Sequence, residues 1–346
     1  MLSNIFKGKE PIFVAEIGLN HNGNIDEAIA MIKAAAECGA DAVKFQTFIP
    51  ELMVSPFASS MLNEEAFMKK DYDTINFFKK FTFSKEEWLR IQEAAKKYNV
   101  EFFSAAFDIP SVELLEELNV RLYKIASSEV TNIPLLEKIG HTKKPVIMST
   151  GMACEEEILS AIETLSKNGT GDIVLLHCVS LYPLDDSEAN LRRVLSLKEK
   201  FKLPVGLSDH SRDHYAAMIA SAFGAVVIEK HFKLHSEHLC PDSEVSLEPE
   251  SFSEMIALAR RGFALAGSGE IKTQGRECNT ARGARRSLFA AKKIPAGKEL
   301  SMDDVIALRP GTGIPVQEIY KYRGKKVLTD IDEGLPLKGE YFEQEQ

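Results

Sequence analysis

Short apolar runs alternate with amphipathic stretches over the first 266 residues of the chain. Eight of these runs are bounded by polar or turn-forming residues, a pattern typical of buried strands. The predicted strands cover residues 12–15, 42–46, 100–104, 121–125, 145–148, 173–176, 203–207 and 225–228. Stretches with helical apolar spacing lie at residues 26–37, 84–98, 110–118, 133–139, 155–166, 187–200, 215–223 and 249–266.

Strict alternation of strand and helix indicates a parallel sheet and the α/β fold class. Eight such units within about 255 residues favour closure into a (β/α)8 TIM barrel. An open doubly wound sheet is the alternative, and it usually carries a G-x-G-x-x-G loop after its first strand. The corresponding turn here is Gly18-Leu19-Asn20-His21-Asn22-Gly23, which does not fit that loop. We therefore expect a closed barrel over residues 1–267.

The composition of the chain changes after Gly267. Residues 268–284 are polar and are expected to form a linker. Residues 285–346 combine short apolar runs with turn signals, which predicts a small β-rich domain near the lower size limit for an independent core. Within the barrel, residues 55–81 are rich in Phe and Met, and both a lid over the site and a covering of the barrel wall fit this composition.

Composition and charge exclude several classes of function. The chain is 45% hydrophobic and 27% charged, as expected for a globular protein, and no apolar run approaches the ~20 residues that span a bilayer. A net charge of −9 argues against nucleic acid as a partner. The five cysteines form no C-x-x-C pair and the first residues do not resemble a secretory signal, so we expect reduced thiols and a cytoplasmic protein.

Two histidines lie one strand–helix unit apart, in Gly206-Leu207-Ser208-Asp209-His210 and in Glu229-Lys230-His231-Phe232. In a parallel barrel both would lie at the carboxyl ends of neighbouring strands, where barrel enzymes keep their active sites. Imidazole is a common ligand of divalent cations, so this spacing indicates a metal site. The alternative is that both histidines merely cap strand ends.

Polar side chains also lie at or directly after the ends of all the remaining predicted strands. The set includes Glu16, Lys44, Gln46, Ser104, Lys124, Ser127, Ser128, Glu129, Ser149, Thr150, His177, Ser208, His210, Glu229 and His231. Lys44 and Lys124 interrupt apolar runs, and lysine is rarely buried without a partner. With the neighbouring hydroxyls and the loop 149–152, they indicate a phosphate or carboxylate site. A Schiff base on either lysine, as in class I aldolases, is the alternative.

The predicted metal site and the predicted anion site together suggest one kind of reaction. A metal with only two protein ligands keeps open positions and acts as a Lewis acid on a carbonyl. The simplest reaction that uses both halves joins a phosphorylated nucleophile, held by the lysines, to a metal-held aldehyde.

Motifs along nearly the whole chain resemble those of the sialic acid (N-acetylneuraminate) synthase family, which makes nonulosonic acids. The matching segments are Ala15 to Gly23, Val43-Lys44-Phe45-Gln46-Thr47, Tyr123-Lys124-Ile125-Ala126-Ser127, Ser149-Thr150-Gly151-Met152, the two histidine segments, Pro241-Asp242 and Arg309-Pro310-Gly311-Thr312-Gly313. The tail from Arg285 resembles the antifreeze-like (SAF) domain of that family. The resemblance implies condensation of phosphoenolpyruvate with an N-acetylated hexosamine and water.

The resemblance also implies roles for individual residues. His210 and His231 would bind manganese, magnesium or cobalt, and Glu16 would lie by the reacting carbons. Phosphoenolpyruvate would be held by Lys44, Lys124, Ser149 and Ser208. Gln46, Tyr182 and Asp242 would line the sugar pocket. Arg309 would reach the sugar from the partner subunit of a domain-swapped homodimer.

Two departures from the family pattern affect the choice of acceptor sugar. Ala105 stands where the N-acetylneuraminate enzymes have threonine, and Ser180 stands where they have asparagine. N-acetylmannosamine therefore remains one alternative beside the legionaminic, pseudaminic and spore-coat polysaccharide branches. A non-catalytic sugar-binding or coat-assembly protein is the alternative outside catalysis.

Overall fold

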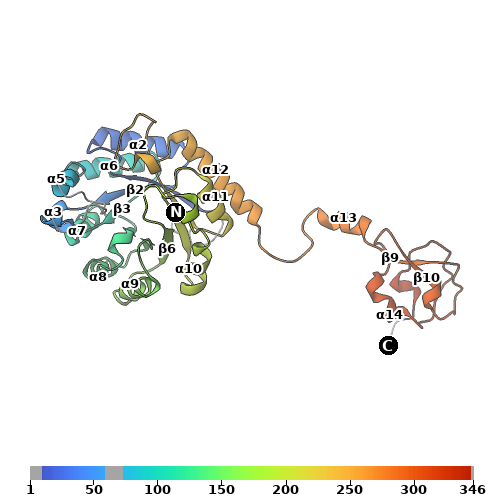
Figure 1. The fold of residues 1–346 in the computed structure, drawn as a ribbon. Coiled ribbons are helices and arrows are strands. Elements are labelled where there is room, and N and C mark those ends of the chain that lie inside the picture. The colour runs from blue at the N-terminus through green and yellow to red at the C-terminus, as the bar shows by residue number, and fades with distance from the viewer. Residues whose placement is uncertain (1–9, 59–72, 344–346) are drawn as a thin grey trace. The chain divides into compact units, whose positions relative to one another are not determined.

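The computed structural model describes residues 10–58 and 73–343, which belong to two compact units. The first unit is Met1–Gly267 and the second is Ser268–Gln346 (Figure 1). The division falls after Gly267, the residue at which the composition of the sequence changes.

The first unit is a closed barrel of eight parallel strands, each paired with its neighbours in sequence and the last paired with the first. The (β/α)8 prediction is therefore confirmed. The strands are β1 (Ile12–Gly18), β2 (Ala42–Thr47), β3 (Glu101–Ala106), β4 (Tyr123–Ile125), β5 (Val146–Ser149), β6 (Ile173–Cys178), β7 (Val205–Asp209) and β8 (Val227–His231).

Helices surround the barrel (Figure 1). In the part of the first unit that the structure describes they are α2 (Ile25–Glu37), α3 (Pro50–Met53), α5 (Thr74–Lys79), α6 (Lys85–Lys97), α7 (Ile109–Glu117), α8 (Ile133–His141), α9 (Glu155–Lys167), α10 (Arg193–Phe201), α11 (Tyr215–Ala222) and α12 (Pro249–Ala266). The start of α6 follows directly from its sequence, because Ser84 and Glu87 form a reciprocal capping box.

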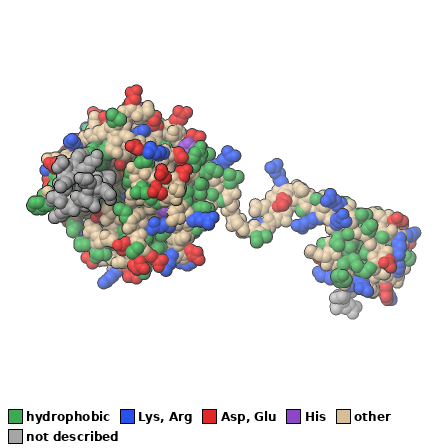
Figure 2. Space-filling view, in the orientation of Figure 1, with side chains coloured by type: hydrophobic (Ala, Val, Ile, Leu, Met, Phe, Trp, Pro, Cys, Tyr) green, Lys and Arg blue, Asp and Glu red, His purple; other side chains and the backbone are tan. Residues whose placement is uncertain are grey.

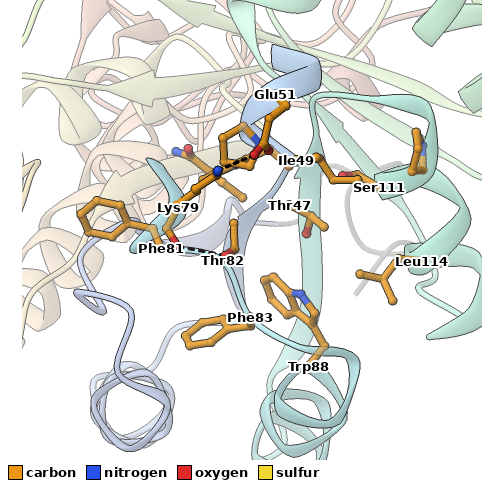
Figure 3. A pocket seen from close by; sticks show the side chains of 14 residues that line it. Thr47, Ile49, Glu51, Lys79, Phe81, Thr82, Phe83, Trp88, Ser111 and Leu114 are labelled. Atoms are coloured by element: carbon orange, nitrogen blue, oxygen red, sulfur yellow. Dashed lines mark hydrogen bonds and ion pairs between the residues drawn. The ribbon is translucent and has the colours of Figure 1, made fainter. Parts of the chain in front are cut away.

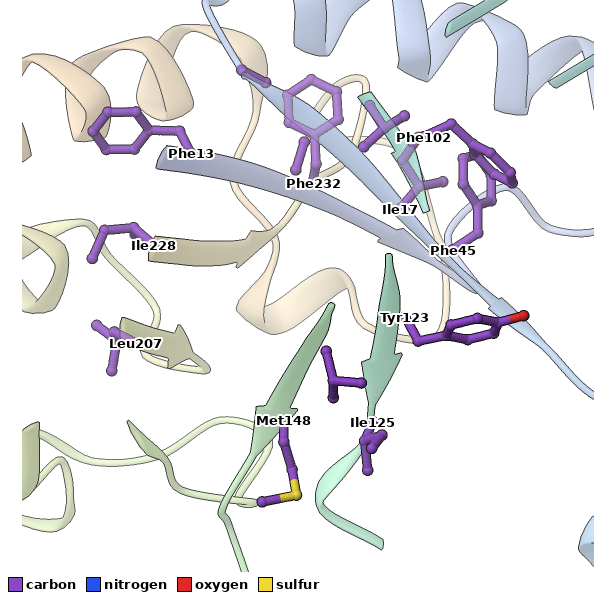
Figure 4. Close-up of a cluster of buried hydrophobic side chains, with 14 of the residues drawn as sticks. Phe13, Ile17, Phe45, Phe102, Tyr123, Ile125, Met148, Leu207, Ile228 and Phe232 are labelled. Carbon is purple, nitrogen blue, oxygen red and sulfur yellow. The ribbon is translucent and has the colours of Figure 1, made fainter. Parts of the chain in front are cut away.

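The two faces of each strand contribute to different cores. Side chains such as Phe13, Phe45 and Ile228 point outward into the large apolar layer between strands and helices (Figure 4). Inward-facing residues form a second, smaller cluster that fills the lower part of the barrel: Ile12, Val14, Ala42, Phe103, Leu122, Ile147, Val174, Leu176 and Val227. This apolar floor leaves the carboxyl ends of the strands as the place where inward-facing polar side chains collect.

One predicted helix and the predicted linker differ from the structure. The helix predicted for residues 187–200 begins only at Arg193, because Asp186–Glu188 is a short 3-10 turn and Asn190 has a φ of 41°, outside the helical region. The predicted linker contains the helix α13 (Glu277–Ala284), whose residues are largely exposed.

The described end of the Phe- and Met-rich segment packs on residues that directly follow β1 and β2. Phe77, Phe78 and Phe81 pack with Leu19 and Phe48. An ion pair of 2.6 Å between Lys79 and Glu51 ties α5 to α3. The alternative of a lid depends largely on residues 59–72, which lie outside the described residues.

Charged side chains of both signs are interspersed on the face of the barrel unit that Figure 2 shows. Some of them link neighbouring helices: Lys85 pairs with Glu117 at 2.6 Å, and Lys138 pairs with Glu113 at 2.7 Å. Such exposed pairs contribute little to stability. Among the helices that the structure describes, none is long and apolar enough to cross a membrane.

The second unit has its own core and a small antiparallel sheet, which confirms the prediction of a β-rich domain. Strands β9 (Ser287–Ala290) and β10 (Val305–Leu308) pair, and the helix α14 (Ile319–Tyr322) follows them. The core is formed by Leu288, Ala290, Ile294, Leu300, Ile314, Val327, Ile331, Leu337 and Phe342.

Candidate active site

A layer of polar side chains lies above the apolar floor of the barrel. Strand residues alternate between the two faces, so the polar residues two positions beyond the inward-facing apolar ones also point inward. The inward-facing strand residues of this layer are Glu16, Lys44, Gln46, Lys124, Ser149, Ser208, Glu229 and His231, and His210 follows directly after β7.

Two of the predicted strand-end residues do not belong to this layer. Ser104 lies on the outer face of β3, where its hydroxyl is 2.7 Å from that of Thr47. His177 lies on the outer face of β6, and its Nε2 is 2.7 Å from the carbonyl oxygen of Ala189. Both predictions were wrong because they relied on closeness to the strand end and ignored which face each position occupies.

Four buried charges form the centre of the layer. The Lys44 ammonium pairs with Glu16 at 2.7 Å and lies 3.7 Å from Glu229. The Lys124 ammonium lies 4.0 Å from the same Glu229 oxygen. Glu229 therefore lies between the two lysines and reduces their mutual repulsion.

The hydroxyl groups predicted for anion binding join this network. The Lys124 ammonium donates to the Ser149 hydroxyl at 2.6 Å. The Ser208 hydroxyl donates to Glu229 at 2.9 Å. The structure thus brings together all four residues predicted to hold phosphoenolpyruvate, with the Glu229 carboxylate of β8 between them.

Burial and neighbouring charges perturb the pKa values of these groups in different directions. Burial raises the pKa of Glu16 to about 7, and Glu229 adds to this while Lys44 opposes it. Burial also disfavours the charged form of Glu229, but Lys124 and Lys44 outweigh it and lower the pKa of that carboxyl. Burial lowers the pKa of Lys124, as expected for a lysine in an enclosed site.

The two predicted metal ligands lie side by side, with ring centroids 5.4 Å apart. Nδ1 of His210 is 2.7 Å from the carbonyl oxygen of Val179, so this nitrogen carries the proton and donates it, and Nε2 remains as a ligand atom. Nδ1 of His231 is buried and has no hydrogen-bond partner among the described residues. Burial is the largest of the effects that hold the pKa of His231 well below 6.5.

These features fit a divalent metal with few protein ligands. His231 is neutral and has an unused buried nitrogen, which is the state that a metal requires of an imidazole. The Asp242 carboxylate lies 3.4 Å from Nδ1 of His231. Within residues 10–58 and 73–343, no three His, Cys, Asp or Glu side chains are placed to hold a metal together. The protein would therefore supply two histidines and leave the other positions to water and substrate.

The residues predicted for the sugar pocket lie around the histidines and Glu16. Tyr182 stacks on His210 with ring centroids 4.0 Å apart. Gln46 donates to Glu16 at 3.2 Å. Arg309 lies in the second unit, in the loop after β10, so its predicted contact with the sugar stays a prediction.

Several residues of the site had no predicted role. Glu229 was expected among the polar strand-end residues without a specific role, and its two-residue spacing from His231 places both on the inner face of β8. Cys178, inward-facing at the end of β6, lies 3.9 Å from Nδ1 of His210. Buried Asn20 donates to the Phe232 carbonyl at 2.9 Å and accepts from the Asp242 amide at 3.2 Å, contacts that no sequence signal indicated.

The two departures from the family pattern both border the site. Ala105 is buried on the inner face of β3 and supplies no hydroxyl. Ser180 lies so close to Gly151 that a Cβ at Gly151 would be 2.4 Å from its hydroxyl oxygen. The loop 149–152 therefore requires glycine where it passes Ser180.

A cavity of about 330 Å³ lies on the outer side of the barrel wall, next to the end of β2 (Figure 3). Thr47, Phe81, Phe83, Trp88 and Leu114 line it. Gln46 is the only predicted site residue among those that line this cavity. Gln46, which donates to Glu16, is thus the one residue that this cavity shares with the cluster of charges and histidines that the structure describes.

Both units match known protein families. Residues 31–271 match the NeuB family, and residues 285–343 match the SAF domain. The chain is 38% identical to the N,N'-diacetyllegionaminic acid synthase of Campylobacter jejuni, over 92% of this chain and 96% of that protein. It is 36% identical to a pseudaminic acid synthase of the same species, over 97% of this chain and 98% of that protein.

A solved structure shares the fold. The N-acetylneuraminic acid synthetase of Leptospira borgpetersenii, in complex with citrate, superposes with a TM-score of 0.71 and is 34% identical. The match covers 79% of this chain and 90% of that one.

Proposed function

The chain belongs to the NeuB family, and from this we propose that it condenses phosphoenolpyruvate with an N-acetylated hexosamine and water to give a nonulosonic acid and phosphate. The observation that carries the proposal is the joining of two half-sites in one barrel mouth. Lys44, Lys124 and Ser149 form an anion-binding half. His210 and His231 form a metal-binding half beside it.

In the first half, the lysines and serines hold phosphoenolpyruvate. Ammonium and hydroxyl donors suit its phosphate and carboxylate groups. Lys124 is already oriented by its hydrogen bond to Ser149, and Ser208 is oriented by Glu229. This arrangement fixes the enol near Glu16 before the acceptor arrives.

In the second half, the open-chain aldehyde of the amino sugar binds next to the histidines. Bound manganese, magnesium or cobalt would supply Lewis-acid polarisation of the aldehyde oxygen. Tyr182 covers His210. Gln46, which donates to Glu16, and Asp242, which lies beside His231, would contact the sugar hydroxyls. In a domain-swapped homodimer, the partner subunit's Arg309 completes this pocket.

The bonds change as follows. The electron pair of the C2–C3 double bond of phosphoenolpyruvate forms a bond from C3 to the aldehyde carbon, whose oxygen takes up a proton from water and becomes a hydroxyl. Water adds at C2, and the C2–O bond to phosphate then breaks, leaving a ketone and free phosphate. Glu16 holds the attacking water and takes its proton, a role suited to a carboxyl whose pKa is raised to about 7.

The acceptor is an amino sugar from one of several branches. The similar proteins are named for legionaminic, pseudaminic and N-acetylneuraminic acid, at identities that differ little. We therefore propose N-acetylmannosamine or a relative with a second acetamido group.

One observation favours a second candidate, a class I aldolase. Burial lowers the pKa of Lys124, and a lysine that forms a Schiff base needs a lowered pKa. Lys124 would then attack a ketone directly, and no metal would be needed.

One assay separates these functions. Purified protein with Mn²⁺ and phosphoenolpyruvate is given each sugar in turn, and phosphate release is measured. We expect release with one class of sugar only, loss in EDTA and loss in His210→Ala. Activity that survives EDTA, with a borohydride-trapped pyruvate adduct on Lys124, would establish the aldolase. No turnover with any sugar would favour a sugar-binding or coat-assembly protein.

A further inference from the structure

A buried ion pair lies directly behind the two histidines, on the outer face of the barrel. Asp209 and Lys230 are register neighbours on β7 and β8. Each comes immediately before a histidine of the site, and strand alternation turns it away from the barrel interior. They share this outer face with Leu207 and Ile228, which belong to the apolar layer under the helices (Figure 4).

The pair holds the backbone on both sides of His210. The Lys230 ammonium donates to the Asp209 carboxylate at 2.9 Å, to the Ser211 carbonyl at 2.5 Å and to the Ser211 hydroxyl at 3.3 Å. The same carboxylate accepts from the Ser211 amide at 2.9 Å and from the Ser211 hydroxyl at 3.0 Å. One side chain of the His231 strand thus fixes the chain immediately before and after His210.

Stability alone does not account for such a pair. The side chains of Lys230 and Asp209 are 0% and 2% exposed, so both charges are removed from water at a cost that their attraction often fails to offset. Apolar residues of similar volume would fill an apolar layer with less loss. What an apolar pair would not provide is the directional set of bonds to Ser211.

The other contacts of the two histidines do not fix the backbones of their strands relative to each other. The hydrogen bond to Val179 orients the His210 ring, and Asp242 lies beside the His231 ring. Neither contact links the backbones of the two metal-ligand strands beyond their ordinary ladder. We propose that Asp209, Lys230 and Ser211 are positioning residues that set the relative placement of His210 and His231, and thereby the affinity of the site for a divalent metal.

This inference rests on the proposed metal site, so the test measures metal binding without turnover. Mn²⁺ is titrated into the metal-free full-length protein, and free Mn²⁺ is followed by electron paramagnetic resonance. The variants are Lys230→Met, the double variant Asp209→Leu/Lys230→Met, which leaves no unpaired charge, and Ser211→Ala, which is the least disruptive to folding. Lys85→Met, which breaks an exposed ion pair of 2.6 Å, is the matched control.

We expect the Mn²⁺ dissociation constant to rise at least 10-fold in the double variant and about 3-fold in Ser211→Ala, with no change in Lys85→Met. Saturating Mn²⁺ should restore much of kcat in the double variant, and KM for phosphoenolpyruvate should stay within about 2-fold, because the lysine half of the site is untouched. A structural role alone would lower thermal stability without moving the metal affinity.

If every variant that folds binds Mn²⁺ as the wild type does, the positioning role is wrong. His210→Ala distinguishes this failure from failure of the proposed function. If His210→Ala also binds Mn²⁺ normally, the metal site itself is wrong; if it loses Mn²⁺ while the double variant and Ser211→Ala keep it, only the positioning role is wrong.

Discussion

Glu16 lies between a lysine that stabilises its charge and a glutamate that opposes it. Its pairing with Lys44 at 2.7 Å does not overcome the effects of burial and of Glu229, so the pKa of Glu16 rises to about 7. A carboxyl with this pKa changes its charge near neutral pH, whereas an ordinary glutamate does not.

Replacing Glu16 with glutamine should remove a pH dependence as well as activity. If the charged form accepts a proton from water, kcat/KM of the wild type falls as the pH drops through about 7. At high pH, Glu16→Gln should have a kcat/KM about 10²–10⁴-fold lower than the wild type, and its kcat/KM should not fall further as the pH drops through about 7. The measurement is a pH profile of phosphate release, with the exposed Glu113→Gln as the control. If the glutamine variant still shows this decrease, another group is responsible for it.

His21 shows the opposite behaviour, because its burial favours the neutral form. Its Nδ1 accepts from the Gly23 amide at 3.0 Å, and its ring packs 4.4 Å from that of Phe83, centroid to centroid. Burial lowers its pKa from 6.5 to about 4. The unfolded chain therefore takes up this proton at a higher pH than the folded protein does.

The stabilisation linked to His21 should be complete above pH 6.5 and lost as the pH falls towards 4. The shift corresponds to at most about 3 kcal/mol. His21→Asn keeps an acceptor for Gly23 and cannot titrate, so its free energy of unfolding should depend less on pH in this range. Denaturant titrations at several pH values measure this, with the exposed His141→Asn as the control. Equal pH slopes in wild type and His21→Asn would contradict the account.

At the scale of strands and helices, the alternation of side chains decides which polar residues reach the site. The hydrophobic runs predicted the position of every strand, yet β1, β7 and β8 extend beyond their runs because the barrel continues through polar residues. The sequence therefore predicted the barrel and most of the site. It misplaced Ser104 and His177 because closeness to the end of a strand does not tell which face of the strand a position occupies.

The bonds of Asn20 and the pair of Asp209 with Lys230 were beyond prediction for another reason. They join segments brought together only by barrel closure. The start of α10 at Arg193 likewise depends on the local turn at Asp186–Glu188. Apolar periodicity alone does not record either kind of contact.

Close packing of α11 on α12 requires a glycine at position 262. A Cβ at Gly262 would lie 2.4 Å from the carbonyl oxygen of Met218, so the two helices would have to separate. Gly262→Ala should therefore destabilise the barrel by about 2 kcal/mol despite the better helix propensity of alanine. Gly283→Ala in α13 has nothing within 4 Å and should cause no loss. Denaturant unfolding of both variants checks this, and equal stabilities would show that the helices adjust freely.

At the scale of the whole molecule, the chain divides into two compact units. Each unit has a core of its own. The histidines belong to the first unit and Arg309 to the second. If the partner subunit's Arg309 completes the sugar pocket, single subunits would be incomplete.

Mixing two inactive variants tests this arrangement. Arg309→Ala and His210→Ala should each lose activity, and in a heterodimer one site recovers both intact residues. After the subunits are exchanged, a 1:1 mixture should regain about a quarter of the wild-type activity, since half of the dimers are mixed and each has one complete site. If Arg309 acts within its own chain, mixing would restore nothing.

The central claim is that this barrel joins phosphoenolpyruvate to an amino sugar with cleavage of the C–O bond. The most direct measurement uses phosphoenolpyruvate labelled with ¹⁸O at the bridging oxygen, together with the accepted sugar, and determines both products by mass spectrometry. The account predicts that the label appears in the released phosphate and that the unlabelled acid contains all the carbons of both substrates. Label retained in the acid, or pyruvate formed without condensation, would contradict it.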